Sequence, residues 1–481
     1  MHMPIPVRKL KKEAAYPADG YTTTDKHVIL MCGNMDGNAN KFYVLELQTN
    51  GSDYRLYSEY GRIGSPNPAR DLRESLSSSE AEKEFARIEK SKGKAKTKTR
   101  KLKDADGNDI VEKHTEQYLA VDIPAPTIGS PNIRAKTDAN GGSTITTSKK
   151  SGAAVGAIFS QVGFQPSVQT LLGQLLAENI HNIEATSNVT VTHNGLETPL
   201  GPITPTHIGT ARDTLNDLQS IKGAGKTNVR DHNERDVRDL NSRFFSLVPH
   251  QFGAKITEAD MLLSDDNINE KIDLLQGMEA ALTVTTADDD KDSPKLPLGM
   301  IELPSNNPDY KAIKQRVVST AKHSDVRDWK VNRVFSTSNS NVDAKYHNPM
   351  GGPEFDLFHG SANANLLSIM MNGFYVPPSS ASHVTGRMFG NGVYGASSSS
   401  KSFRYSVGMW GGRRSRMQTA YMFVVRFGMG KIFETDTTRT QGAPKGYHSI
   451  HAKAGRHLMN DEYIVYNTNQ AKITHLIEMA K

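Results

Sequence analysis

The sequence predicts a multidomain α+β protein. A small antiparallel sheet with one helix is followed by an all-α bundle and by a second α+β unit of mixed antiparallel sheets with short helices. Three observations support this prediction. The chain has 481 residues, and one core rarely grows beyond roughly 250 residues, so about three domains are expected. Two polar segments divide the chain, and the period of the apolar residues changes from one segment to the next.

The first unit is expected over residues 24–119, after a flexible N-terminus of residues 1–23. The stretches NKFYVLELQ and DYRLYSEYGRIGS have the pattern of strands, and the second enters a glycine turn. The stretch SSSEAEKEFARIEKSK opens with serines ahead of a helical pattern, and serine is a favoured helix cap. These patterns predict a small sheet crossed by one helix.

A linker and a helical unit follow. Residues 120–151 are rich in Pro, Gly, Ser and Thr, which is typical of a linker. Within residues 152–285, the stretches PSVQTLLGQLLAENI and DNINEKIDLLQGMEAAL repeat apolar residues at intervals of three and four. Thr204 and Pro205 are suited to a helix cap and a first helical position. We therefore expect a helical bundle.

The last unit is expected over residues 295–481, behind the acidic stretch ADDDKDSPK. AYMFVVRFG, EYIVYN and ITHLIEMA have the pattern of strands, and NANLLSIMMNGF has the pattern of a short helix that ends at Gly373. The strands and helices do not alternate as in a doubly wound sheet, and the sequence contains no phosphate loop of the GxxxxGK[ST] type. We therefore expect an α+β unit without a dinucleotide-binding crossover.

Composition limits the chemistry and the compartment. The one cysteine, Cys32, excludes a disulfide framework and a cysteine-based zinc site within one chain. Without a signal-peptide core or a run of about eighteen apolar residues, the chain is expected to be soluble and intracellular, with no membrane partner.

The net charge is +6, but residues 83–103 hold ten basic and two acidic residues. This tract either contacts nucleic-acid phosphates or forms a solvated tail. Residues 295–481 are also basic, with 23 Lys and Arg against 12 Asp and Glu.

Glu462 is the most informative single residue. It shares a predicted strand face with Ile464 and Tyr466, in a segment that otherwise favours burial. An ionised carboxylate is costly to bury unless it is paired or lines a cleft. Glu462 is therefore either part of a functional cleft or a strand-end residue that faces solvent.

Two further groups of residues have the chemistry of a binding site. His359 and Ser361 lie on one side of an extended chain, and Gly360 between them exposes its backbone to a flat ligand. Tyr394 and Tyr405 bracket a serine cluster, and two rings with nearby hydroxyls can hold an aromatic amide. Taken alone, these residues also fit a capped turn and two core tyrosines.

The order and spacing of these residues resemble the catalytic domain of the DNA-dependent poly(ADP-ribose) polymerases. The resemblance is carried by FHGS, VTGRMFGNGVYGASSSSKSFRYS, PKGYHSI and NDEYIVYN. Upstream, DLNSRFFSLVPHQFG and TPLGPITPTHIGTARDTLNDLQ resemble the helical regulatory domain of the same enzymes, and NKFYVLEL with EYGRIGS resembles their WGR domain. The resemblance implies a WGR-like sheet with a helix, a regulatory bundle and an ADP-ribosyltransferase fold, in that order.

The resemblance implies that NAD⁺ is a substrate whose nicotinamide–ribose bond is broken. ADP-ribose would pass to protein acceptors, including the chain itself, without a metal ion. In the family pattern, His359 binds the adenosine ribose and the backbone of Gly360 holds the nicotinamide carboxamide. Ser402 donates to the carboxamide oxygen, Tyr405 stacks on the nicotinamide ring, and Tyr394 closes the pocket on its other side.

The remaining implied roles concern the adenosine half and catalysis. Ser361 and Asn365 would lie along the adenosine half of NAD⁺. Glu462 would bind a ribose hydroxyl, orient the acceptor and stabilise an oxocarbenium-like transition state, as in glycoside hydrolysis. His359, Tyr394 and Glu462 form a His-Tyr-Glu set that accompanies polymer formation in the family.

The chain departs from the family pattern at several positions. The loop before the glutamate, residues 451–460, is short, which leaves the acceptor and the polymer length open. Tyr375 stands where an arginine contact to the nucleotide is expected, and Arg387 replaces an aromatic residue in the loop over the donor site. The tryptophan of the WGR motif is replaced by Tyr60.

The WGR-like unit implies binding of DNA, at strand breaks with a 5′ phosphate. Tyrosine can stack on a base, arginine pairs with phosphate, and a basic run adds affinity that salt weakens. The helical unit would restrain the NAD⁺ cleft until DNA binds. Such a protein is expected in the nucleus of a eukaryote, or otherwise in a nucleoid or host cytoplasm. The expected DNA contacts are Tyr60, Arg62, Lys92, Lys94 and Lys96.

Two other functions remain open from the sequence. One is a DNA-end-binding scaffold that keeps the NAD⁺ pocket but transfers little, and such a scaffold would not need Glu462. The other is a mono-ADP-ribosyltransferase or toxin-like enzyme that acts on one partner. Enzymes of the second kind usually lack the helical and WGR-like units.

Overall fold

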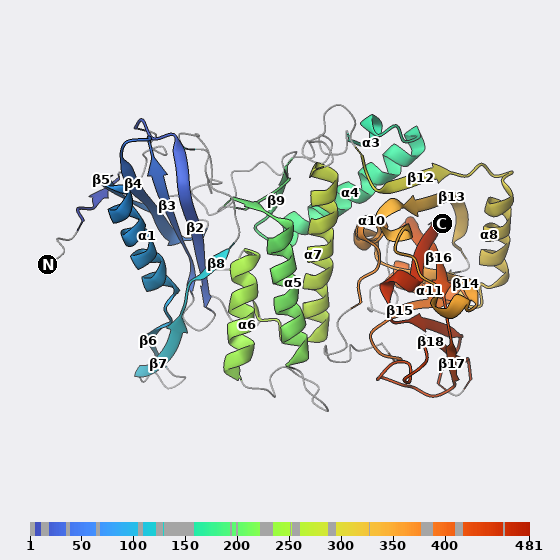
Figure 1. Ribbon diagram of the computed structural model, residues 1–481. Coiled ribbons are helices and arrows are strands. Elements are labelled where there is room, and N and C mark those ends of the chain that lie inside the picture. The colour runs from blue at the N-terminus through green and yellow to red at the C-terminus, as the bar shows by residue number, and fades with distance from the viewer. Residues whose placement is uncertain are drawn as a thin grey trace. The chain divides into compact units, whose positions relative to one another are not determined.

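The computed structural model forms two compact units, each described by itself (Figure 1). The N-terminal unit comprises Met1–Ser148 and Ile183–Ile268, and the C-terminal unit comprises Lys149–Asn182 and Asn269–Lys481. The predicted helical region contributes to both units. The structure describes residues 5–10, 19–34, 39–63, 68–103, 109–121, 128, 158–192, 195–198, 201–221, 234–250, 252, 260–286, 295–326, 328–376, 388–408, 417–455 and 457–481.

The N-terminal unit contains a six-stranded antiparallel sheet and helix α1 (Ser78–Gly93), as predicted. Ser77 caps α1 in a capping box, in which its hydroxyl accepts from Glu80 N and the Glu80 side chain accepts from Ser77 N. Phe85 and Ile88 of α1 pack against leucines of the sheet. In sheet order, the strands are β1 (Arg8–Lys9), β5 (Ala69–Leu76), β4 (Tyr54–Arg62), β3 (Ala39–Thr49), β2 (Thr23–Asn34) and β8 (Leu119–Val121).

The basic tract of residues 83–103 is folded. Its first half lies in α1, and its second half forms β6 (Lys96–Lys103), which pairs antiparallel with β7 (Asp109–Glu116). Lys98 and Lys41 both contact the buried carboxylate of Glu116, at 2.6 and 2.8 Å. The interpretation of this tract as a solvated tail is therefore wrong.

Part of the predicted helical region belongs to the N-terminal unit. α5 (Pro205–Ser220) begins after Thr204, whose hydroxyl accepts from His207 N at 3.2 Å, so the predicted cap is confirmed. α6 (Glu234–Leu247) contacts β2, where Gly33 N donates to Ser246 Oγ at 2.6 Å. The helical pattern did not predict the short antiparallel sheet that precedes α5, which consists of β9 (Thr190–Thr192), β10 (Gly195–Thr198) and β11 (Gly201–Ile203).

A nine-stranded sheet forms the centre of the C-terminal unit. Neighbouring strands run antiparallel except for one parallel pair, β17 and β18. Helices α8 (Pro308–Ser319) and α11 (Ser399–Ser406) share an apolar core with the sheet, whereas α10 (Asn363–Asn372) ends at Gly373 with a φ of 80°, as predicted. In sheet order, the strands are β12 (Leu298–Glu302), β13 (Lys330–Asn339), β20 (Ala471–Ala480), β16 (Thr419–Gly428), β14 (Glu354–Gly360), β15 (Val393–Ala396), β19 (Glu462–Val465), β18 (Ser449–Ala452) and β17 (Ile432–Thr435).

Three helices of the predicted helical region belong wholly or mostly to the C-terminal unit: α3 (Ile158–Gln161), α4 (Pro166–Thr186) and α7 (Asp265–Thr286). Asn179 Nδ2 of α4 donates to Gly277 O of α7 at 2.9 Å. A side chain at Gly277 would overlap Asn179, so the two helices pack closely there. The α+β class predicted from the sequence is confirmed.

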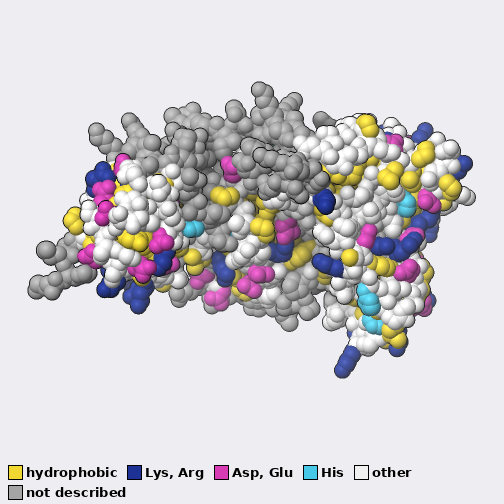
Figure 2. Space-filling model, turned by 45° about the horizontal axis from the view of Figure 1, so that its top comes forward, with side chains coloured by type: hydrophobic (Ala, Val, Ile, Leu, Met, Phe, Trp, Pro, Cys, Tyr) yellow, Lys and Arg dark blue, Asp and Glu magenta, His cyan; other side chains and the backbone are white. Residues whose placement is uncertain are grey.

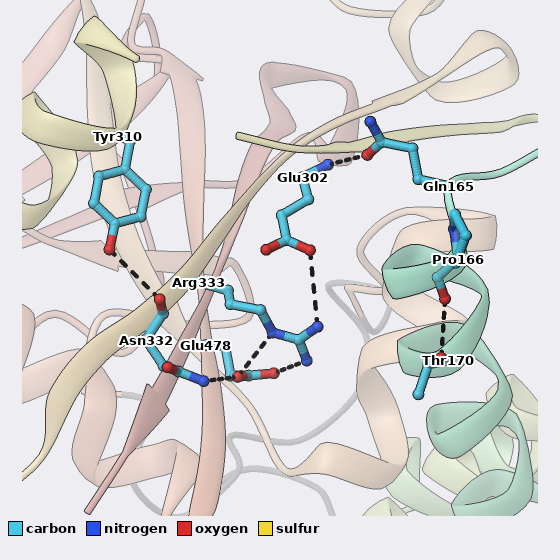
Figure 3. Close-up of polar contacts among 8 residues, drawn as sticks. All are labelled: Gln165, Pro166, Thr170, Glu302, Tyr310, Asn332, Arg333 and Glu478. Atoms are coloured by element: carbon cyan, nitrogen blue, oxygen red, sulfur yellow. Dashed lines mark hydrogen bonds and ion pairs between the residues drawn. The ribbon is translucent and has the colours of Figure 1, made fainter. Parts of the chain in front are cut away.

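A polar cluster joins the β12 edge of the sheet to the segment before α4 (Figure 3). Glu478 of β20 is buried and accepts from Arg333 Nε at 3.0 Å and from Arg333 Nη2 at 2.5 Å. Glu302 of β12 lies 3.9 Å from Arg333, and its backbone N–H donates to Gln165 Oε1 at 3.0 Å. Because Glu478 is buried, loss of Arg333 would leave an uncompensated charge in the sheet.

Candidate active site

The centre of the candidate site is the end of β14, where it passes α11. A Cβ on Gly360 would overlap the carbonyl oxygen of Ser402 and lie 3.0 Å from Ser406 Oγ. Ser402 Oγ is buried and donates to Phe358 O at 2.8 Å. Only glycine fits at position 360, because the tertiary structure brings its backbone against the backbone carbonyl of Ser402.

His359 and Tyr394 are held in fixed orientations. His359 Nδ1 lies 2.8 Å from Tyr394 O, and a carbonyl only accepts, so Nδ1 carries the proton and Nε2 is an acceptor. Burial lowers the pKa of His359, although this hydrogen bond opposes the shift, so the ring is neutral at pH 7. The Tyr394 hydroxyl donates to Gly390 O at 2.8 Å and accepts from Phe389 N at 3.0 Å.

Glu462 is 7% exposed and forms an ion pair with Lys401 of α11. The exposed strand-end interpretation of Glu462 is therefore wrong. Strand pairing brings the site together, because Glu462 lies opposite Ala396 of β15 and Ala396 lies opposite Phe358 of β14. The buried pair provides a carboxylate of fixed position two strands away from the Gly360 backbone.

Lys401 was not predicted from the sequence. It lies between Ser400 and Ser402 in a polar segment, where a lysine usually has its charge in solvent. Burial lowers the pKa of Lys401 to about 8, and the carboxylate of Glu462 in contact with it acts in the opposite direction. The sequence signal that could have identified Lys401 is its helical spacing. Lys401 and Tyr405 are four residues apart on α11, so they lie on the same face of the helix.

The serine cluster before Lys401 anchors α11 to the end of α8. Ser398 Oγ donates to Thr320 O at 3.0 Å, and Ser399 Oγ donates to Val317 O at 2.7 Å. Ser400 Oγ accepts from backbone N–H groups of the segment that follows α8. These three hydroxyls form hydrogen bonds within the C-terminal unit, and it is the backbone carbonyl of Ser402 that lies against Gly360.

The other predicted ligand residues lie on α10, before it, and on α11. Ser361 is partly buried, and Tyr405 is 47% exposed. Asn365 Nδ2 donates to Asp273 Oδ2 of α7 at 2.9 Å, within the C-terminal unit. Asp273, in the predicted helical region, thus accepts a hydrogen bond from a side chain that is predicted to lie along the adenosine half.

Three buried polar atoms on the elements of the site have no hydrogen-bond partner among the described residues: Asn363 Oδ1, Ser406 Oγ and Asn460 Oδ1. Asn363 follows Ser361 closely, Ser406 lies against Gly360, and Asn460 precedes Glu462. Unsatisfied buried polar atoms are uncommon in folded proteins. Their position on these elements is consistent with a site that binds a polar ligand.

Of the two departures from the family pattern near the donor site, Tyr375 is partly buried and Arg387 lies outside the described residues.

The residues predicted to contact DNA lie at the end of β4 and around the end of α1. Tyr60 stacks on Tyr43, with ring centroids 5.4 Å apart, and donates to Asp71 Oδ2 at 3.1 Å. Lys92 Nζ lies 3.9 Å from the centre of the Tyr43 ring. The remaining three residues are exposed: Arg62, Lys94 and Lys96.

The surface charges are mixed on the face drawn in Figure 2, where Lys and Arg lie among Asp and Glu. No group of three or more His, Cys, Asp or Glu residues suited to hold a metal ion occurs in the described part of the chain. Within that part, no helix is long and apolar enough to cross a membrane.

Three family models match the chain in succession. The WGR domain matches residues 27–102, the poly(ADP-ribose) polymerase regulatory domain matches residues 164–298, and the poly(ADP-ribose) polymerase catalytic domain matches residues 307–456. The order is the one predicted from the sequence motifs. The last match ends just before Glu462.

Curated relatives match along most of the chain. Poly [ADP-ribose] polymerase 1 of Oryza sativa is 24% identical over 95% of this chain and 47% of its own length. Protein mono-ADP-ribosyltransferase PARP3 of Mus musculus is 25% identical over 87% of this chain and 75% of its own length. Poly [ADP-ribose] polymerase 2 of Homo sapiens is 24% identical over 64% of this chain. The chain thus spans about half the length of the rice relative and three quarters of the mouse relative.

Proposed function

We propose, from the premise that the chain belongs to the poly(ADP-ribose) polymerase family, that it is an NAD⁺-dependent protein ADP-ribosyltransferase. The observation that supports this function most strongly is the buried pair of Lys401 and Glu462 near the Gly360 backbone. A scaffold without transfer would gain nothing from burying this charge. We therefore favour an active enzyme over a binding module.

The residues of the β14 end would hold the two halves of NAD⁺. The backbone of Gly360 offers an N–H donor and a carbonyl acceptor to the nicotinamide carboxamide, and the exposed ring of Tyr405 offers a stacking face. The hydroxyl proton of Ser402 is engaged with Phe358 O, so donation to the carboxamide requires that this bond be exchanged. His359 Nε2 accepts from a ribose hydroxyl of the adenosine half.

Glu462 would act on the nicotinamide ribose. The bond from C1 of this ribose to the nicotinamide nitrogen breaks, nicotinamide leaves with the electron pair, and positive charge develops on the ribose. Glu462 accepts a hydrogen bond from a ribose hydroxyl and lies where this charge develops, while Lys401 keeps the carboxylate ionised and oriented. The acceptor attacks C1 and releases its proton to a base, for which Glu462 is available.

Labelled NAD⁺ tests the proposal, with and without a DNA break that carries a 5′ phosphate. The His359, Tyr394 and Glu462 set supports polymer formation, which would appear as a ladder of modified protein. A single modified band would indicate mono-ADP-ribosylation, the activity in the mouse relative's name, since the short loop of residues 451–460 leaves the polymer length open. No labelled protein under either condition would contradict the transferase function.

DNA is the proposed activator, and α7 is the proposed restraint. The WGR match and the exposed Arg62, Lys94 and Lys96 support DNA binding. The hydrogen bond from Asn365 to Asp273 occupies a residue of the adenosine half. If binding of a DNA strand break weakens the hydrogen bond between Asn365 and Asp273, the protein population shifts toward an NAD⁺-competent state. In a eukaryote, this function requires a nuclear location.

Gly360→Ala is expected to weaken NAD⁺ binding by about tenfold or more and to destabilise the protein by about 1–3 kcal/mol, because the methyl group overlaps Ser402 O. Isothermal titration with NAD⁺ and thermal unfolding measure both effects. Gly173→Ala is the matched control, since Gly173 lies in α4 and a methyl group there would enter open space. Unchanged NAD⁺ affinity in Gly360→Ala would remove the Gly360 backbone from the proposed pocket.

The rate of transfer is expected to fall as the pH rises through and above 8. The pKa of Lys401 is lowered to about 8, so Lys401 is charged below this pH and loses its proton above it, which leaves Glu462 without its cation. In Lys401→Arg the charge persists, because arginine titrates above pH 12, and the alkaline fall should disappear from the pH profile of kcat. A fall of equal size in Lys401→Arg would assign it to another group.

A further inference from the structure

His323 joins the two segments that carry the ion pair. Its backbone N–H donates to Ser400 Oγ at 3.2 Å, and Ser400 is followed directly by Lys401. Its ring nitrogen Nε2 lies 3.0 Å from Asn460 Nδ2, and Asn460 stands two residues before Glu462. One residue between α8 and β13 therefore contacts the start of α11 and the loop that leads into β19.

The contact with His323 holds the buried side-chain amide of Asn460. Asn460 is 5% exposed, and its Oδ1 has no hydrogen-bond partner among the residues described. His323 Nε2 accepts from the Asn460 amide, so the neutral ring carries its proton on Nδ1. Without His323 the amide would lose this hydrogen bond while remaining buried. A buried unsatisfied amide is costly, and movement of the loop before Glu462 would relieve the cost.

The attachment of α11 to α8 does not depend on the His323 ring. Ser398 Oγ donates to Thr320 O, and Ser399 Oγ donates to Val317 O. Ser400 accepts the backbone N–H of His323, which any residue other than proline supplies. Substitution of the ring should leave Lys401 in place and release the loop before Glu462.

We propose that His323 is a positioning residue for the transfer reaction. It fixes the loop of Asn460, and through this loop the carboxylate of Glu462 relative to Lys401. It does not touch NAD⁺. The inference rests on the proposed transferase function, in which Glu462 acts on the ribose. Because a misplacement of about 1 Å at a reacting group can cost about a hundredfold in rate, a partial release should be measurable.

The test compares steady-state transfer in the full chain with saturating activating DNA. His323→Ala and Asn460→Ala are each expected to lower kcat by about tenfold, with the KM for NAD⁺ changed by less than about twofold. Because the two residues act through one contact, the double variant should be no slower than either single variant. In His323→Gln, the side-chain oxygen can accept from Asn460, which should restore kcat to within about threefold of the unmodified chain. His457→Ala is the matched control, an exposed histidine in the same loop as Asn460.

Several outcomes would overturn the inference: an unchanged kcat in His323→Ala, additive losses in the double variant, no restoration by glutamine, or an equal loss in His457→Ala. A raised KM with unchanged kcat would instead make His323 a substrate contact and would also overturn it. If His323→Ala does not fold, Asn460→Ala and His323→Gln give the same comparison from either side of the contact. An inactive unmodified chain would contradict the proposed function itself.

Discussion

Glu462→Gln is expected to reduce ADP-ribose transfer by about a hundredfold to a thousandfold, the effect of removing one well-placed group from a developing charge. Glutamine has nearly the same shape and its amide oxygen can still accept from Lys401, so the fold should be retained, with some loss of stability because Lys401 loses its counter-charge. It carries no negative charge, so the oxocarbenium-like ribose loses its nearby carboxylate. Transfer of labelled ADP-ribose measures the loss in kcat, and titration with NAD⁺ shows whether binding persists.

The control for Glu462→Gln is Glu434→Gln. The Glu434 side chain is 57% exposed and paired with Lys453 at 2.6 Å. An exposed ion pair contributes at most about 1 kcal/mol, so this variant should transfer normally. Undiminished transfer in Glu462→Gln would refute the assignment of Glu462 as the catalytic carboxylate.

Removal of residues 152–285 is expected to give transfer without DNA at a rate at least about tenfold above that of the intact chain without DNA. The physical reason is the restraint of Asn365 by Asp273, which is lost with α7. The measurement is labelled transfer in the presence and absence of a DNA break. A truncated protein that folds and still requires DNA would contradict the proposed switch.

Asp273→Ala tests the same restraint without removing a helix. One hydrogen bond contributes roughly 0.5–1.5 kcal/mol, so transfer without DNA should rise by about twofold to tenfold. Asp273→Asn is the matched control, because an amide oxygen at this position can still accept from Asn365 Nδ2. Equal transfer without DNA in the alanine variant and the intact chain would show that this contact does not restrain the site.

Local patterns were sufficient where neighbouring residues determine the structure. The caps at Ser77 and Thr204 and the stop at Gly373 depend on side chains or backbone angles within a few residues, and all three are confirmed. The short strands β9 to β11 were missed, because three or four residues are too few to show a period of two. The basic tract of residues 83–103 was left open between a nucleic-acid contact and a solvated tail, since charge alone does not decide between them.

By itself, the sequence determined the three successive domain types and the α+β class, and it supplied the residues of the proposed NAD⁺ site. Three features were decided only by the tertiary structure: the pairing of Lys401 with Glu462, the hydrogen bond from Asn365 to Asp273, and the overlap that keeps position 360 a glycine. The reason is physical. Each of these contacts joins residues that are distant in the chain, and only strand pairing and helix packing bring their atoms within hydrogen-bonding or van der Waals range.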